Sequence, residues 1–206
     1  MFALLLFCSL LLPGHSFSAD GAVGKWTVVQ GRVAVTAAGA GGTRLARTGD
    51  TIAVGDLLET GEDARAQALL ADDTVVNLSS GTSARILQYS FDPAGGRRTA
   101  VVKLLGGKAR FIVSARKSSR FNVESAQAAV AAVAAADFVA LAAPAATTVA
   151  ALDGGVRVKN VSNLIVAEYE LWSNQTTVVR SGAAPSRPAP IAPQQRKDYR
   201  KDARHF

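Results

Sequence analysis

Apolar and polar residues alternate most clearly between residues 54 and 86, where the chain also has its best-defined turns. Residues 64–70 place a small or apolar side chain at every second position, which is the period of a half-buried β-strand. Residues 74–78 alternate in the same way after the acidic pair Asp72 and Asp73. Two alternating runs about a two-residue turn predict a β-hairpin.

Short alternating or β-branched runs recur along the rest of the chain, separated by glycine, proline and asparagine. They predict strands at residues 26–29, 32–36, 84–89, 100–105, 109–114, 164–172 and 176–180, with residues 100–105 and 109–114 on either side of Gly106 and Gly107. Residues 151–159 are predicted to be a strand pair about Gly154. Residues 92–98 and 116–120 are rich in glycine or charge and predict loops. The pattern as a whole predicts an all-β fold of about a dozen short strands.

Turn glycines recur at Gly31, Gly55, Gly81 and Gly106, a spacing of 24 to 26 residues. A fixed period in that range is typical of coiled or solenoid-like β-structure. A twisted two-layer β-sandwich also turns at such intervals. The sequence therefore leaves two architectures open, an elongated twisted β-sandwich and a β-roll or solenoid-like domain.

The first twelve residues are almost wholly apolar and end at Pro13. A helix of that length is too short for a hydrocarbon core of about 30 Å, but it suits a signal peptide. Ser16 and Ser18 predict cleavage before Ala19, so residues 1–18 are expected to form a flexible leader. No lysine or arginine precedes the apolar run, which leaves the true start codon open. We expect a periplasmic or secreted bacterial protein without a membrane span.

Cysteine and histidine are almost absent, since Cys8 and His15 lie in the leader and His205 lies near the end. The body at residues 19–180 therefore offers no thiolate nucleophile, histidine base or cysteine–histidine metal site. The acidic pairs at residues 62–63 and 72–73 fit turns better than an acid–base pair, because neighbours on a strand point to opposite faces. The sequence predicts no catalytic, metal or cofactor site, and we expect no enzymatic activity.

The net charge of +7 is concentrated at the C-terminus, where residues 180–206 hold seven basic and two acidic residues. Four prolines interrupt this stretch, so residues 181–206 are predicted to be a disordered tail whose removal leaves folding unchanged. The chain lacks an aromatic platform for stacking bases, so nucleic acid is not the expected partner. Another envelope protein, or an anionic envelope polymer or lipid head group, is expected instead.

The turns and strands resemble those of the FecR domain, in which the hairpin turn is Asp-Gly. The landmarks of that pattern fall here on Gly55-Asp56, Thr60-Gly61, Asp72-Asp73, Ser83, Asp137-Phe138 and the closing strand at residues 152–158. The resemblance covers residues 26–180 and implies a non-catalytic module that binds or senses a partner in envelope signalling. The alternative is a structural protein tethered to cell wall or membrane through its basic tail.

Residues 126–151 present a conflict, because fifteen of these 26 residues are alanine. Helix propensity favours a helix, which stays open for residues 126–143. Both flanks contain β-branched residues, and the FecR resemblance implies extended structure. We predict strands at residues 138–141 and 147–152, with Phe138 and Ala140 on one face and Val139 and Leu141 on the other.

Overall fold

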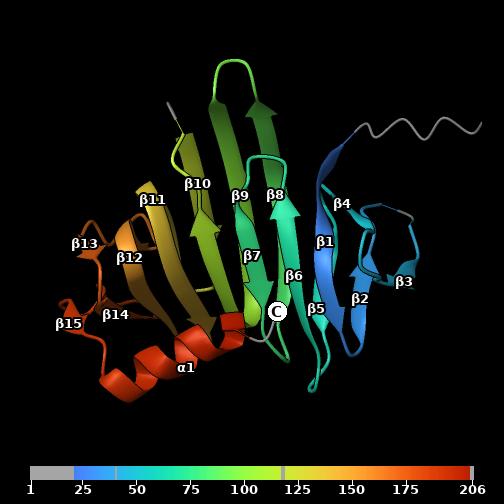
Figure 1. The fold of residues 1–206 in the computed structure, drawn as a ribbon. Coiled ribbons are helices and arrows are strands. Elements are labelled where there is room, and N and C mark those ends of the chain that lie inside the picture. The colour runs from blue at the N-terminus through green and yellow to red at the C-terminus, as the bar shows by residue number, and fades with distance from the viewer. Residues whose placement is uncertain (1–20, 40, 117–118, 205–206) are drawn as a thin grey trace, which may run out of the picture.

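The computed structural model describes residues 21–39, 41–116 and 119–204 (Figure 1). These residues form fifteen strands and one helix, which confirms the all-β prediction apart from the C-terminal helix. The predicted leader lies outside the described residues. The strands are β1 (Ala22–Gln30), β2 (Val33–Thr36), β3 (Thr43–Leu45), β4 (Thr51–Ala53), β5 (Leu57–Thr60), β6 (Arg65–Leu70), β7 (Val75–Leu78), β8 (Ser83–Asp92), β9 (Arg97–Val113), β10 (Ser119–Glu124), β11 (Ala128–Ala142), β12 (Ala146–Asn160), β13 (Glu168–Trp172), β14 (Gln175–Arg180) and β15 (Ala189–Pro190), and the helix is α1 (Pro193–Arg204).

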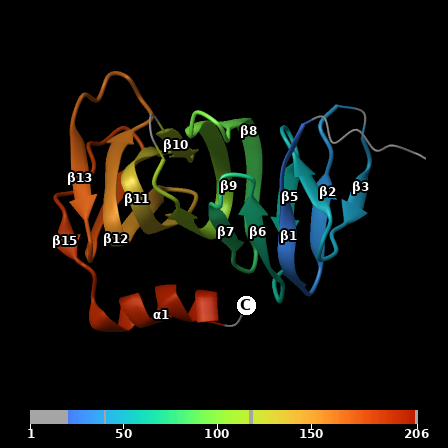
Figure 2. The ribbon, with the colours of Figure 1, turned by 45° about the horizontal axis from the view of Figure 1, so that its top comes forward.

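Backbone hydrogen bonds join all the described strands into one sheet, which long bent strands fold into two layers (Figure 2). The first half of β9 pairs with β8 and β10, whereas its second half pairs with β7 and β11. Likewise β12 pairs first with β14 and then with β13. We call the layer that contains β8 and β10 the β8 layer, and the one that contains β6 and β7 the β7 layer. The arrangement is elongated and twisted. It has two layers, as the predicted sandwich would, and its chain coils from one layer to the other, as in the predicted β-roll.

Glycines mark the places where two of the long strands pass between the layers. Gly107 in β9 has a φ of 86°, and a Cβ there would lie 2.6 Å from the backbone of Gly81 and Thr82. Gly154 in β12 has a φ of 70°, and a Cβ there would lie 2.1 Å from the carbonyl oxygen of Ala135. The strand pairs that the sequence predicted about these glycines are therefore single strands with a bend.

Side chains that point between the two layers form one apolar core. The ring of Phe111 in the β7 layer lies 5.9 Å from that of Phe121 in the β8 layer, measured between centroids. It stacks on Phe138 at 5.2 Å. These large rings fill the space that the many alanines leave between the layers, which keeps the core closely packed.

The alanine-rich segment is extended, as predicted. β11 and β12 pair antiparallel along most of their length. Phe138 and Ala140 are buried in the core, whereas Val139 and Leu141 face the outer side of the β7 layer. Neighbouring strands on both sides of β11 and β12 satisfy their backbone groups, and this tertiary context overrides the helix propensity of alanine.

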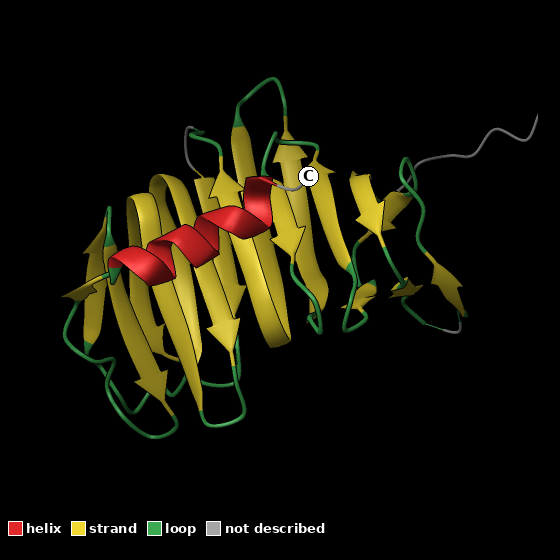
Figure 3. Ribbon diagram, turned by 60° about the horizontal axis from the view of Figure 1, so that its bottom comes forward, coloured by secondary structure: helices red, strands yellow, loops and turns green. Residues whose placement is uncertain are grey.

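Helix α1 crosses the outer side of the β7 layer (Figure 3). Ile191 and Tyr199 are buried there against Val139, Ala150 and Leu152. Just before the helix, β15 pairs with β14. These contacts correct the prediction of a disordered tail for the described residues 181–204. The prediction of disorder was based on the charged residues and the prolines of this segment, whereas the apolar side chains of Ile191 and Tyr199 dock it on the sheet. That removal of residues 181–206 leaves folding unchanged stays a prediction.

Some local predictions were also wrong. β9 begins at Arg97, so Arg98 lies in a strand and not in a loop. β13 begins at Glu168, so residues 164–167 belong to a loop. The short strands β3, β4 and β5 were not predicted, because three or four residues carry too little periodic signal.

Candidate interaction site

The hairpin between β6 and β7 carries one aspartate into the interior at one end of the two layers. Asp73 has a φ of 64°, which is the left-handed region that favours glycine, and the FecR pattern has glycine at this position. This turn leaves the side chain of Asp73 largely exposed and the side chain of Asp72 fully buried. The two carboxylates therefore lie in a turn, as expected, and do not form an acid–base pair.

Asp72 is the centre of a buried polar cluster that we call the Asp72–Arg98 cluster. Arg98 Nη1 donates to Asp72 Oδ2, and also to Thr74 Oγ1 at 2.9 Å. The hydroxyl of Tyr89 donates to Asp72 Oδ1 at 3.0 Å. Arg98 Nη2 donates to Ser119 Oγ at 2.5 Å. These groups come from the β6–β7 turn and from β8, β9 and β10, so the cluster ties the two layers together.

The electrostatics of the cluster fix its charge state near neutral pH. Burial raises the pKa of Asp72, but the hydrogen bonds from Arg98 and Thr74 outweigh this effect and bring the pKa below its ordinary value. Burial and the neighbouring carboxylate raise the pKa of Tyr89 well above its ordinary value. Asp72 thus stays ionised and Tyr89 stays neutral, which suits a structural role and not proton transfer.

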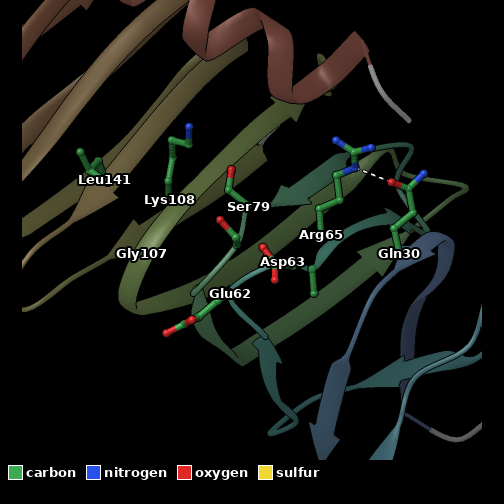
Figure 4. A pocket seen from close by; sticks show the side chains of 10 residues that line it. Gln30, Glu62, Asp63, Arg65, Ser79, Gly107, Lys108 and Leu141 are labelled. Atoms are coloured by element: carbon green, nitrogen blue, oxygen red, sulfur yellow. Dashed lines mark hydrogen bonds between the residues drawn. The ribbon is translucent and has the colours of Figure 1, made fainter.

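An open pocket of about 580 Å³ lies on the outer side of the β7 layer (Figure 4). Its lining contains two carboxylates, two basic side chains, two serines and the half-exposed Leu141; the residues are Gln30, Glu62, Asp63, Ala64, Arg65, Ser79, Ser80, Gly107, Lys108 and Leu141. Arg65 Nε donates to Gln30 Oε1 across its rim. A shallow surface of mixed charge resembles the rim of a protein–protein interface more than an enclosed small-molecule site.

An ion pair also joins β9 and β11, which contribute Lys108 and Leu141 to this pocket. Arg110 Nε and Nη2 donate to the two carboxylate oxygens of Asp137 at 2.7 and 2.6 Å. The side chains are only 13% and 20% exposed, and the bidentate contact links the two neighbouring strands. The sequence marked Asp137 only as a landmark, because nothing along the chain shows that Arg110 faces it.

The described ranges contain no group of three or more histidine, cysteine, aspartate or glutamate residues placed to hold a metal ion. Within the same ranges, no helix combines the length and apolar character that crossing a membrane requires. Glu62 and Asp63, which the sequence assigned to a turn, lie on the rim of the pocket. The lining of the pocket presents charged, hydroxyl and apolar side chains to solvent.

Comparison with known families identifies this scaffold. Residues 56–157 match the family described as FecR protein. The chain carries a FecR domain. The match runs from the turn before β5 into β12 and includes both the Asp72–Arg98 cluster and the Arg110–Asp137 pair. The matched region is shorter than residues 26–180, the range over which the sequence resembles a FecR domain. Strands β1 to β4 and the segment from β13 to α1 therefore lie outside the matched region.

Two solved structures share the fold of this FecR-domain chain. Both are crystal structures of a candidate anti-sigma factor from Parabacteroides distasonis, one at 1.65 Å and one at 2.50 Å resolution. Each is 23% identical to this chain, with a TM-score of 0.53 over 67% of it. The matched part spans 61% of the Parabacteroides chain. No curated protein sequence matches the chain.

Proposed function

We propose that this protein is a non-catalytic interaction module of bacterial envelope signalling, and that it acts in the periplasm. The FecR domain at residues 56–157 carries the proposal. The fold that it shares with a candidate anti-sigma factor supports a regulatory role. The apolar leader supports export.

The open pocket on the β7 layer is the proposed contact surface for a protein partner. Glu62 and Asp63 are exposed on its rim, and Leu141 adds an apolar contact that is 37% exposed. Recognition by such a rim depends on complementary charge, which sets the rate and specificity of association. A partner segment that presents lysine or arginine beside an apolar side chain fits this arrangement.

A genetic experiment in the source bacterium tests the proposal. Deletion of the gene should change a defined set of transcripts, and the wild-type gene should restore them. The double charge reversal Glu62→Lys and Asp63→Lys should fail to restore them, although both side chains are exposed and the fold should persist. The control Glu59→Lys reverses one acidic charge at an exposed position of β5 that does not line the pocket, and it should restore them fully.

The outcomes separate the general proposal from the assigned surface. An unchanged set of transcripts after deletion would refute a signalling role. Full restoration by the Glu62→Lys, Asp63→Lys variant would instead show that the partner binds elsewhere. Both variants should be purified and shown to melt within a few degrees of the wild type, so that loss of folding does not imitate loss of binding.

The second candidate function is that of a structural protein tethered to an anionic envelope polymer. Helix α1 favours it, because Arg196, Lys197 and Arg200 are exposed while Tyr199 packs inward. Such binding would be electrostatic and sensitive to salt. If this function is correct, 0.5 M salt should release the protein from envelope fractions, and replacing these three basic residues with glutamine should do so without salt.

A further inference from the structure

The loop between β12 and β13 is unusually apolar for an exposed connection. Leu164 is 93% exposed and Val166 is 89% exposed, and Val161 is 41% exposed. Single exposed aliphatic residues are ordinary, but three within six positions of one loop form a cluster that water solvates poorly. We call residues 161–167 the apolar tip.

Hydrogen bonds hold the base of the apolar tip in place. Asn160 Nδ2 donates to the carbonyl oxygens of Arg180 and Ala183 at 3.0 and 2.8 Å. The backbone nitrogen of Val161 donates to the carbonyl oxygen of Gln127 at 3.0 Å. The tip therefore projects from an ordered base, with its aliphatic side chains directed into solvent.

The turns beside the tip are uncharged as well. Gln127 Nε2 donates to the carbonyl oxygen of Pro144 at 3.0 Å, which brings the exposed turn at residues 143–145 next to the tip. Residues 143–145, 160–167 and 181–184 contain no charged side chain. Lys159 and Arg180 are exposed at the border of this uncharged end. Two acidic residues, Glu124 and Glu168, line a pocket together with Lys159, and Glu168 also lies 3.6 Å from Arg157.

We infer that the apolar tip docks on a lipid bilayer with anionic head groups and inserts Leu164 and Val166 into its interface. Aliphatic side chains that project almost completely free can enter the boundary between head groups and acyl chains. Lys159 and Arg180 would then lie at the level of the head groups, and the net charge of +7 adds attraction. This mode of binding does not depend on the signalling role proposed above.

Site-specific fluorescence tests the inference on the full chain. The substitution Cys8→Ser removes the only cysteine, and Leu164→Cys then allows an environment-sensitive dye to be placed on the tip. The matched control carries the dye through Leu45→Cys on β3, which is 61% exposed and lies at the other end of the molecule (Figure 1). A dye reports only its own surroundings, so lipid contacts of residues 1–18 do not imitate insertion of the tip.

Vesicles of phosphatidylcholine and phosphatidylglycerol should shift the emission at position 164 to shorter wavelength and leave position 45 unchanged. A second experiment places the dye through Ser162→Cys, so that Leu164 and Val166 stay available for substitution. In that labelled protein, Leu164→Ser together with Val166→Ser should weaken vesicle binding at least about tenfold, because two inserted side chains are lost. Emission at position 164 that vesicles leave unchanged would overturn the inference. An equal shift with pure phosphatidylcholine would overturn the assigned head-group charge.

Discussion

Replacement of Arg98 by methionine should destabilise the protein strongly, because it removes one partner of a buried ion pair. Asp72 and Arg98 are 0% and 2% exposed. Methionine replaces the aliphatic part of the arginine side chain but leaves the Asp72 carboxylate without its cation in the interior. Breaking a buried pair in this way costs about 3–5 kcal/mol of unfolding free energy. For a domain of this size, that corresponds to a fall in melting temperature of roughly 6–20 °C.

The neighbouring Arg97 provides the control. It pairs with Asp92 at 3.1 Å, but the two side chains are 71% and 39% exposed. An exposed pair contributes about 0–1 kcal/mol, so Arg97→Met should hardly change stability. Urea unfolding followed by tryptophan fluorescence measures both variants under the same conditions, since Trp26 lies in the core.

A double substitution separates the loss of the pair from the cost of an unpaired charge. Asp72→Asn together with Arg98→Met leaves no isolated ion in the interior, so it should cost less than the sum of the two single changes, by at least about 1 kcal/mol. If Arg98→Met costs no more than Arg97→Met, the Asp72–Arg98 cluster does not hold the layers together. If the two single costs simply add, the destabilisation comes from packing and not from charge.

Three further outcomes are expected. The pKa of Asp72 lies below its ordinary value of 3.8, so the contribution of this carboxylate to stability should be complete above about pH 4 and lost as the pH falls through the lower folded-state pKa. Melting curves recorded at acid pH should show this loss of stability, and the Asp72→Asn variant should lack this pH dependence. Tyr199→Ala should undock α1, so that trypsin cleaves the basic tail at least about tenfold faster while Gln195→Ala does not. N-terminal sequencing of exported protein should begin at Ala19, and a membrane-bound form that starts at Met1 would contradict cleavage.

The sequence predicted features whose signal is local. The β6–β7 hairpin was found because period-2 alternation and a turn signal coincide within fifteen residues, 64–78. The bends at Gly107 and Gly154 were seen as breaks, but a glycine that ends a strand and one that bends it look the same in sequence. Only the pairing of each half of the strand with different neighbours distinguishes them.

The polar contacts of the candidate site could not be predicted in the same way. Arg98 lies in a stretch of glycines and charges that is typical of a loop, and its partner Asp72 is 26 residues away. Arg110 and Asp137 are separated by 27 residues and meet only because β9 and β11 are neighbours. Pairs of this kind depend on strand order, which a single sequence does not define.

The alanine-rich segment and the helix that follows it later in the chain have one explanation. Alanine in β11 and β12 looked like a helix signal, yet these residues form a sheet whose outer side has few bulky side chains. Tyr199 of α1 and the preceding Ile191 pack with Ala150, Val139 and Leu152 on that side, because a small residue lets the helix come close to the sheet. The helix itself has the polar, charged composition that suggested disorder. Composition was therefore misleading in both segments for related reasons. The alanines that suggested a helix form the sheet surface on which α1 packs, and α1 is ordered because this surface buries Tyr199 and the preceding Ile191.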